Sequence, residues 1–162
     1  MRSNFELIAE GLDVAPALAE LGALPDYCWV RINADDSRYV GLLAGTRQRQ
    51  FEAELPEVWR LIEQVLAILA TDHGDRGGLC HARVGLMPPG EGLPPHFDGV
   101  DGITQRRYQL ALQSRPGVEL TVGGEPKCPR PGEVWRIAAS RTHSVYNRSD
   151  ADRITILFDT QD

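Results

Sequence analysis

The chain has 162 residues, of which 42% are hydrophobic and 25% are charged, proportions typical of a folded globular protein and not of a disordered or fibrous one. Its 17 basic and 23 acidic residues give a net charge of −6, which disfavours nucleic acid and acidic membrane surfaces as partners. The three cysteines, Cys28, Cys80 and Cys128, form no CxxC pair, and the N-terminal segment lacks the unbroken apolar stretch of a secretion signal. We therefore expect one domain over residues 1–162, located in the cytoplasm.

Residues 1–78 predict a mixture of helix and strand that supports the rest of the chain. Asp13 and the apolar run after it predict a capped helix that ends near Gly22, and the run WVRIN predicts a strand over 29–33. The clearest helix lies between Pro56 and Ala70, where apolar residues recur at steps of three and four. We expect one face of this helix to cover a sheet.

Residues 79–162 have a different sequence pattern, in which short apolar or alternating runs are separated by proline and glycine. Strands are predicted in LCHARVGLM, RRYQLALQS, VELTV, EVWRIA, HSVYN and RITILFD, and PPGEGLPP predicts a loop between strands. This rhythm is typical of a small antiparallel sandwich or barrel.

Two of the four histidines stand in a pattern that suits a metal ion. His96 and Asp98 are two residues apart in the motif HFD, so an extended chain points both side chains to one face. His143 begins the later run HSVYN, and the intervening strands allow it to lie beside the first pair. Two imidazoles and one carboxylate occupy one face of an octahedral Fe(II) and leave three positions for other ligands. The residual positive charge of such a site attracts an anionic chelating cosubstrate.

An arginine ten residues beyond His143 strengthens this interpretation. Arg153 begins RITILFD, where alternation places Arg153, Thr155, Leu157 and Asp159 on one face of the strand. A guanidinium and a hydroxyl on one face can hold a carboxylate together.

The order HFD, RRYQLAL, GEVW and THSVYNRSDADRITILFD resembles the aspartyl/asparaginyl β-hydroxylase family of Fe(II)- and 2-oxoglutarate-dependent dioxygenases. The resemblance covers about residues 80 to 160. It implies an α+β fold with a double-stranded β-helix (jelly-roll, cupin-like) core in residues 79–162, on which the N-terminal helices pack. It also implies Fe(II), 2-oxoglutarate and O2 as cofactor and cosubstrates, with hydroxylation of a substrate C–H bond and release of succinate and CO2.

Matched position by position, the resemblance implies that His96, Asp98 and His143 bind iron and that Arg153, supported by Thr155, binds the far carboxylate of 2-oxoglutarate. Arg107 resembles a second family arginine near the cosubstrate, with Arg106 as the alternative. Gln109 is expected on the same strand face as Arg107.

The substrate is expected to be a small amino acid or derivative, with a residue in a peptide or protein as the alternative. Some family members carry glycine where this chain has Asp98, so the complete triad is more similar to the amino-acid-hydroxylating relatives. The segment Gly99 to Gln105 is a candidate for substrate contacts. Two alternative functions stay open from the sequence: a noncatalytic or sensory cupin-like metal-binding protein, and a metal dioxygenase without a cosubstrate.

Overall fold

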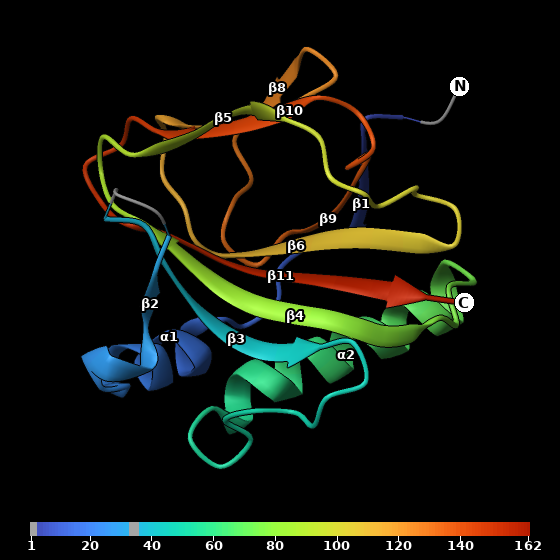
Figure 1. Ribbon diagram of the computed structural model, residues 1–162, viewed down its shortest axis with the longest axis horizontal. Coiled ribbons are helices and arrows are strands. Elements are labelled where there is room, and N and C mark those ends of the chain that lie inside the picture. The colour runs from blue at the N-terminus through green and yellow to red at the C-terminus, as the bar shows by residue number, and fades with distance from the viewer. Residues whose placement is uncertain (1–2, 33–35) are drawn as a thin grey trace.

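The computed structural model describes residues 3–32 and 36–162, which contain two antiparallel sheets and two α-helices (Figure 1). The strands of the larger sheet are β1 (Phe5–Ala9), β2 (Val30–Arg31), β3 (Arg38–Ala44), β4 (Gly78–Met87), β6 (Gln105–Gln113), β9 (Val134–Ile137) and β11 (Arg153–Gln161). The strands of the smaller sheet are β5 (Gly92–His96), β7 (Val118–Val122), β8 (Glu125–Lys127) and β10 (His143–Asn147). The helices are α1 (Ala15–Ala23) and α2 (Pro56–Asp72), and a short 3-10 turn covers Asp26–Cys28.

The elements form three layers, with the helices below the larger sheet and the smaller sheet above it (Figure 1). The larger sheet has the strand order β1-β9-β6-β11-β4-β3-β2, and the smaller has β5-β10-β7-β8. Two antiparallel sheets stacked in this way agree with the jelly-roll architecture expected for the chain.

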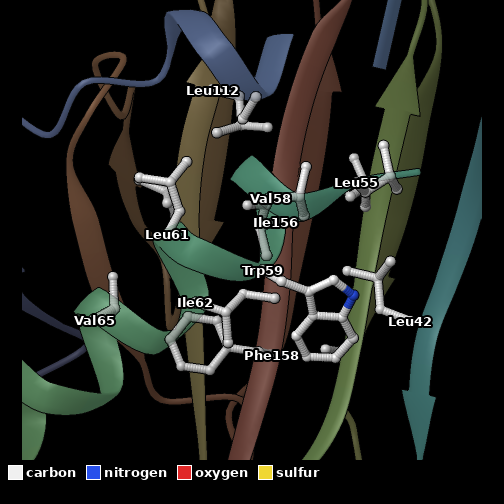
Figure 2. Packing of buried hydrophobic residues seen from close by; sticks show 14 of the residues in the cluster. Leu42, Leu55, Val58, Trp59, Leu61, Ile62, Val65, Leu112, Ile156 and Phe158 are labelled. Carbon is white, nitrogen blue, oxygen red and sulfur yellow. The ribbon is translucent and has the colours of Figure 1, made fainter. Parts of the chain in front are cut away.

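Helix α2 packs its apolar side chains against the lower face of the larger sheet. Figure 2 shows Leu61 and Ile62 of the helix beside Ile156 and Phe158 of β11, and all four side chains are fully buried in one cluster. Tyr108 of β6 stacks on Phe158 in the same cluster. Burial of several large apolar side chains, each contributing about 1.5–3 kcal/mol, fixes the sheet that carries the site.

The N-terminal part contributes strands as well as helices to this sheet. Strand β1 pairs with β9, and β3 pairs with β4. The larger sheet therefore contains strands from both sides of residue 78. The predicted helices are present as α1 and α2, and the carboxylate of Glu20 on α1 accepts hydrogen bonds from the N–H groups of Glu57 and Val58 at the start of α2. Such contacts between segments distant in sequence leave no local pattern.

Two predicted boundaries are corrected by the structure. The predicted loop PPGEGLPP contains the start of β5, because the strand begins at Gly92 and includes two prolines. Proline is tolerated there since β5 is an edge strand that pairs only with β10. The strand expected over 29–33 is confined to Val30–Arg31, and residue 33 lies outside the described residues.

A membrane-crossing helix would have to be longer and more apolar than either α1 or α2, and the described residues contain none of that kind.

Candidate metal and cosubstrate site

The strand pair β5–β10 brings two histidines together. His96 is the last residue of β5, His143 is the first residue of β10, and the register pairs the two directly. Their ring centroids lie 4.3 Å apart. The later strand thus returns beside the HFD motif, as the sequence predicted.

Asp98 completes the cluster from the segment that follows β5. Its N–H donates a hydrogen bond to the carbonyl of Ala139, which holds the chain close to the start of β10. One carboxylate oxygen lies 3.3 Å from Nε2 of His143, and the other lies 3.8 Å from Nε2 of His96. One ligand atom from each of the three residues lies within 4.8 Å of the others. The three donors therefore converge on one point.

Backbone carbonyls fix the proton on both rings. Nδ1 of His96 lies 2.8 Å from the carbonyl oxygen of Pro94, and Nδ1 of His143 lies 2.8 Å from that of Arg141. Because a carbonyl oxygen only accepts, each Nδ1 carries a hydrogen and donates it. In the neutral rings Nε2 then presents a lone pair toward Asp98, which is the tautomer required of a metal-binding histidine. The donor set and its orientation fit a divalent metal ion.

The cluster shifts the pKa values of its own members. The hydrogen bond with His143, together with the charge of Arg107, lowers the pKa of Asp98. The same hydrogen bond raises the pKa of His143, against the opposing effect of burial. The carboxylate therefore stabilises a proton on His143, and a cation bound by these side chains takes the place of that proton.

Strand β11 presents alternating faces to the cavity and the core. Arg153, Thr155 and Leu157 line the cavity beside the three metal-ligand candidates, whereas Ile156 and Phe158 point into the core below the sheet. This alternation is the one predicted for RITILFD. The expected guanidinium and hydroxyl thus face the same space.

Arg153 lies in this cavity as a partly buried cation without a carboxylate partner in the described part of the chain. Its Nη2 donates a hydrogen bond to Oε1 of Gln109, 2.9 Å away. Burial lowers the pKa of Arg153 to about 10, which leaves it charged at neutral pH. A guanidinium whose hydrogen-bond partner is a neutral amide keeps its charge available for an anion.

The cavity has a volume of about 130 Å³ and two kinds of lining. Its polar end contains Arg153, Thr155 and Gln109, and Gly85 pairs with Thr155 on the neighbouring strand. An added Cβ at Gly85 would meet nothing within 4 Å, so this position leaves the cavity open. The apolar wall includes Leu86, Met87, Leu93, Leu120 and Val145.

The structure places Arg107, and not Arg106, in the cavity. The two arginines are neighbours on β6 and therefore point to opposite faces. Arg106 forms two hydrogen bonds to the carboxylate of Asp75, at 2.7 and 2.8 Å, away from the cavity. Arg107 lines the cavity and donates to Asp98 and Asp159.

Sequence reasoning assigned no role to three neighbours of the site, Asp159, Arg83 and Tyr39. Asp159 accepts two hydrogen bonds from Arg107, and the guanidinium of Arg83 lies 5.9 Å from the ring centre of Tyr39. Period-two alternation in RITILFD already placed Asp159 on a defined face, but the strands opposite it were not predicted.

The segment Gly99 to Gln105 does not line the cavity. Val100 is buried, and the carboxylate of Asp101 accepts hydrogen bonds from the N–H groups of Ile103, Thr104 and Gln105. These local bonds hold the segment in a turn that leads into β6.

Comparison with known families gives one match along most of the chain. The sequence profile of the family described as Aspartyl/Asparaginyl beta-hydroxylase matches residues 25–162. The match begins far upstream of residue 80, so the similarity includes β2, β3 and α2 as well as the later strands. No curated protein matches the chain.

Several solved structures have a similar fold. The α-ketoglutarate-dependent epimerase SnoN from nogalamycin biosynthesis superposes with a TM-score of 0.73 at 20% identity, over 99% of this chain and 78% of SnoN. HygX from Streptomyces hygroscopicus, solved with nickel and 2-oxoglutarate, gives 0.72 at 14% identity, over 98% and 83%. The collagen prolyl hydroxylase of Paramecium Bursaria Chlorella virus-1, solved with 2-oxoglutarate, gives 0.65 at 13% identity, over 99% and 97%. At these identities the likeness establishes the fold.

Proposed function

The chain belongs to the aspartyl/asparaginyl β-hydroxylase family, and we propose that it is an Fe(II)- and 2-oxoglutarate-dependent dioxygenase that hydroxylates a C–H bond of an amino acid or of an amino-acid residue in a peptide. One observation carries this proposal. The convergent cluster of His96, Asp98 and His143 shares a cavity with Arg153, a partly buried cation that has no carboxylate partner in the described residues.

The three cluster residues hold Fe(II) through Nε2 of each histidine and a carboxylate oxygen of Asp98. A bound Fe(II) would supply O2 activation, coupled to the conversion of 2-oxoglutarate to succinate and CO2. Asp98 contributes the one negative charge of the ligand set, which leaves the metal cationic enough to attract an anionic cosubstrate.

Arg153 and Thr155 orient the cosubstrate at the polar end of the cavity. The guanidinium fork pairs with the far carboxylate, and the hydroxyl of Thr155 donates a further hydrogen bond. Gln109 holds Arg153 in place through its amide oxygen. Apolar side chains also line the cavity that the cosubstrate shares with the metal ligands.

A groove beside the cavity supports the substrate part of the proposal. Tyr39 and Arg83 line both the cavity and the groove, which continues over His81, Gly41 and Arg47 on β3, β4 and the segment after β3. The groove lining contains two arginines and no acidic residue, although the whole chain carries a net charge of −6.

Two polar groups in the groove favour an anionic substrate group. Burial lowers the pKa of Arg83, and its guanidinium has no ion-pair partner in the described ranges, 3–32 and 36–162. Nδ1 of His81, two residues away on the same strand face, is buried without a hydrogen-bond partner. A carboxylate of the amino acid or peptide substrate pairs with the guanidinium of Arg83.

Two further expectations stay predictions. The shared larger sheet supports a single domain for the whole chain, because its strands come from both halves of the sequence. The cytoplasmic location rests on the three cysteines, whose wide spacing predicts no disulfide framework.

The test is a succinate-release assay with Fe(II), 2-oxoglutarate and O2 against a panel of amino acids and short acidic peptides. We expect one substrate class to stimulate succinate formation and to gain a single oxygen atom, detected by mass spectrometry. A protein that binds Fe(II) and 2-oxoglutarate, but whose turnover responds to no substrate of the panel, would contradict the proposed substrate class. A protein that binds metal and shows no affinity for 2-oxoglutarate would support the binding-protein alternative.

A further inference from the structure

Arg107 and Asp159 form a buried pair with defined geometry. They are directly opposite each other in the register of β6 and β11. Nε and Nη2 of Arg107 donate hydrogen bonds to the two carboxylate oxygens of Asp159, each with a donor–acceptor distance of 2.8 Å. The side chains are 12% and 1% exposed, respectively. Two parallel bonds between planar groups hold the guanidinium in one orientation.

The remaining nitrogen of this guanidinium faces the metal cluster. Nη1 of Arg107 donates a hydrogen bond to Oδ2 of Asp98. On the other side of Asp159, Nε2 of Gln105 donates a hydrogen bond to Oδ2 of Asp159, with a distance of 3.0 Å. A continuous chain of hydrogen bonds therefore runs from Gln105 through Asp159 and Arg107 to the carboxylate of Asp98.

The two arginines expected at the cosubstrate differ in their partners. Arg153 has a neutral amide as its hydrogen-bond partner, whereas Arg107 has carboxylates on two sides. The negative charges of Asp98 and Asp159 already neutralise the guanidinium of Arg107, so it attracts a further anion less strongly than Arg153 does.

We propose that Arg107 and Asp159 are positioning residues for Asp98: Asp159 locks the guanidinium of Arg107, and Arg107 orients the Asp98 carboxylate toward the metal. This inference rests on the proposed metal site. Asp98 lies outside any strand, so its carboxylate needs such a partner to hold one direction.

Loss of the Asp159 charge changes the balance on Arg107. In an Asp159→Asn variant, the amide presents one oxygen in place of two, and Asp98 becomes the nearest remaining carboxylate. Arg107 then pairs more strongly with Asp98 and competes with the metal ion for it. Residues that orient metal ligands typically affect metal affinity about 10- to 100-fold.

The chain contains a matched control for this experiment. Asp75 forms the same two-bond pair with Arg106, the neighbour of Arg107, on the opposite face of the sheet, and its side chain is 6% exposed. Asp75→Asn therefore removes an equivalent buried charge without touching the metal cluster. Both variants lose folding stability, and only Asp159→Asn is expected to lose metal affinity.

The experiment is a titration of Co(II) alone into the metal-free full-length protein, followed by the visible absorption of the bound ion. We expect the parent to bind one Co(II) per chain. Asp159→Asn should bind Co(II) about 10- to 100-fold more weakly and with an altered spectrum. Asp75→Asn should keep the parental Kd for Co(II) and the parental spectrum. Thermal unfolding of each variant shows that it is folded. Parental affinity and spectrum in folded Asp159→Asn would overturn the inference while leaving the proposed function intact.

A second variant covers the case in which Asp159→Asn does not fold. Arg107→Lys keeps the positive charge between Asp98 and Asp159 but cannot form the planar fork. We expect its Co(II) affinity to fall at least about tenfold. Unchanged affinity in folded Arg107→Lys would refute the positioning role, and a parent that binds no Co(II) would remove the proposed metal site and this inference together.

Discussion

Replacing Arg153 with alanine removes the cation at the polar end of the cavity. No carboxylate loses its counter-ion in this variant. In the structure its side chain bonds only the amide of Gln109 among the described residues. The variant therefore loses one hydrogen bond from a charged donor, about 1.5–3 kcal/mol, and relief of a partly buried charge that lacked a counter-ion offsets much of this loss. We expect its free energy of unfolding to differ from the parental value by no more than about 1.5 kcal/mol.

The effect on 2-oxoglutarate is much larger. A hydrogen bond to a charged group contributes about 1.5–3 kcal/mol, so the loss of even one such bond to the far carboxylate raises the Kd for 2-oxoglutarate about 10- to 150-fold. Arg153→Lys should be intermediate, because an ammonium keeps the charge but forms no fork. Thr155→Val, which loses only a neutral donor, should raise the Kd about 2- to 10-fold.

Anaerobic titration of 2-oxoglutarate into the Fe(II) protein, followed by the visible charge-transfer band of the chelate, measures each Kd. Arg83→Ala is the matched control, since it removes another buried guanidinium that lines the same cavity but lies on the groove side. Its 2-oxoglutarate Kd should stay within about threefold of the parent, whereas its KM for substrate should rise. Equal Kd values for parent and Arg153→Ala would refute the assignment of Arg153 to the cosubstrate.

Three other perturbations test the fold and the site. Alanine at His96 or His143 leaves two fixed donors, and equilibrium dialysis should show loss of tight Fe(II) binding; full occupancy in both variants would place the metal elsewhere. Burial alone would raise the pKa of Asp75, but its hydrogen bonds outweigh this effect and hold the pKa well below its usual range. The contribution of the ionised carboxylate to folding stability is therefore present above the unfolded-state pKa of about 3.9 and is lost as pH falls. Urea unfolding should therefore show Asp75→Asn less stable than the parent by about 3 kcal/mol at pH 7, with the difference shrinking below about pH 4; a pH-independent difference would contradict this linkage. At Gly92 a Cβ would overlap the ring of Tyr146, so Gly92→Ala should lower stability by about 1–3 kcal/mol and weaken metal binding through β5, and an unchanged Tm would argue against this close packing.

The sequence alone determined those features that depend on local periodicity. The three- and four-residue spacing of apolar residues after Pro56 predicted helix α2, and the period-two pattern of RITILFD placed Arg153 and Thr155 on the face opposite Ile156 and Phe158. The HFD motif and His143 identified the metal-ligand candidates, because the chemistry of a metal site restricts the residue types that can form it.

Pairings between distant strands were decided only by the tertiary structure. The sequence left Arg106 and Arg107 as alternatives, since a shift of one residue in register exchanges the faces of a strand. The prolines after Gly92 led to the prediction of a loop in place of β5. A strand with prolines is possible here because β5 lies at a sheet edge, which the sequence does not show.

The same limit applies to charge. Arg107 and Arg153 look alike as residues, and their difference comes from Asp159 and Asp98, which the fold brings to one guanidinium and not to the other. A side chain's residue type sets its intrinsic charge and donors, whereas its partners come from residues far away in sequence. Which arginine already has carboxylate partners within the protein is therefore decided by the packing of the strands against one another.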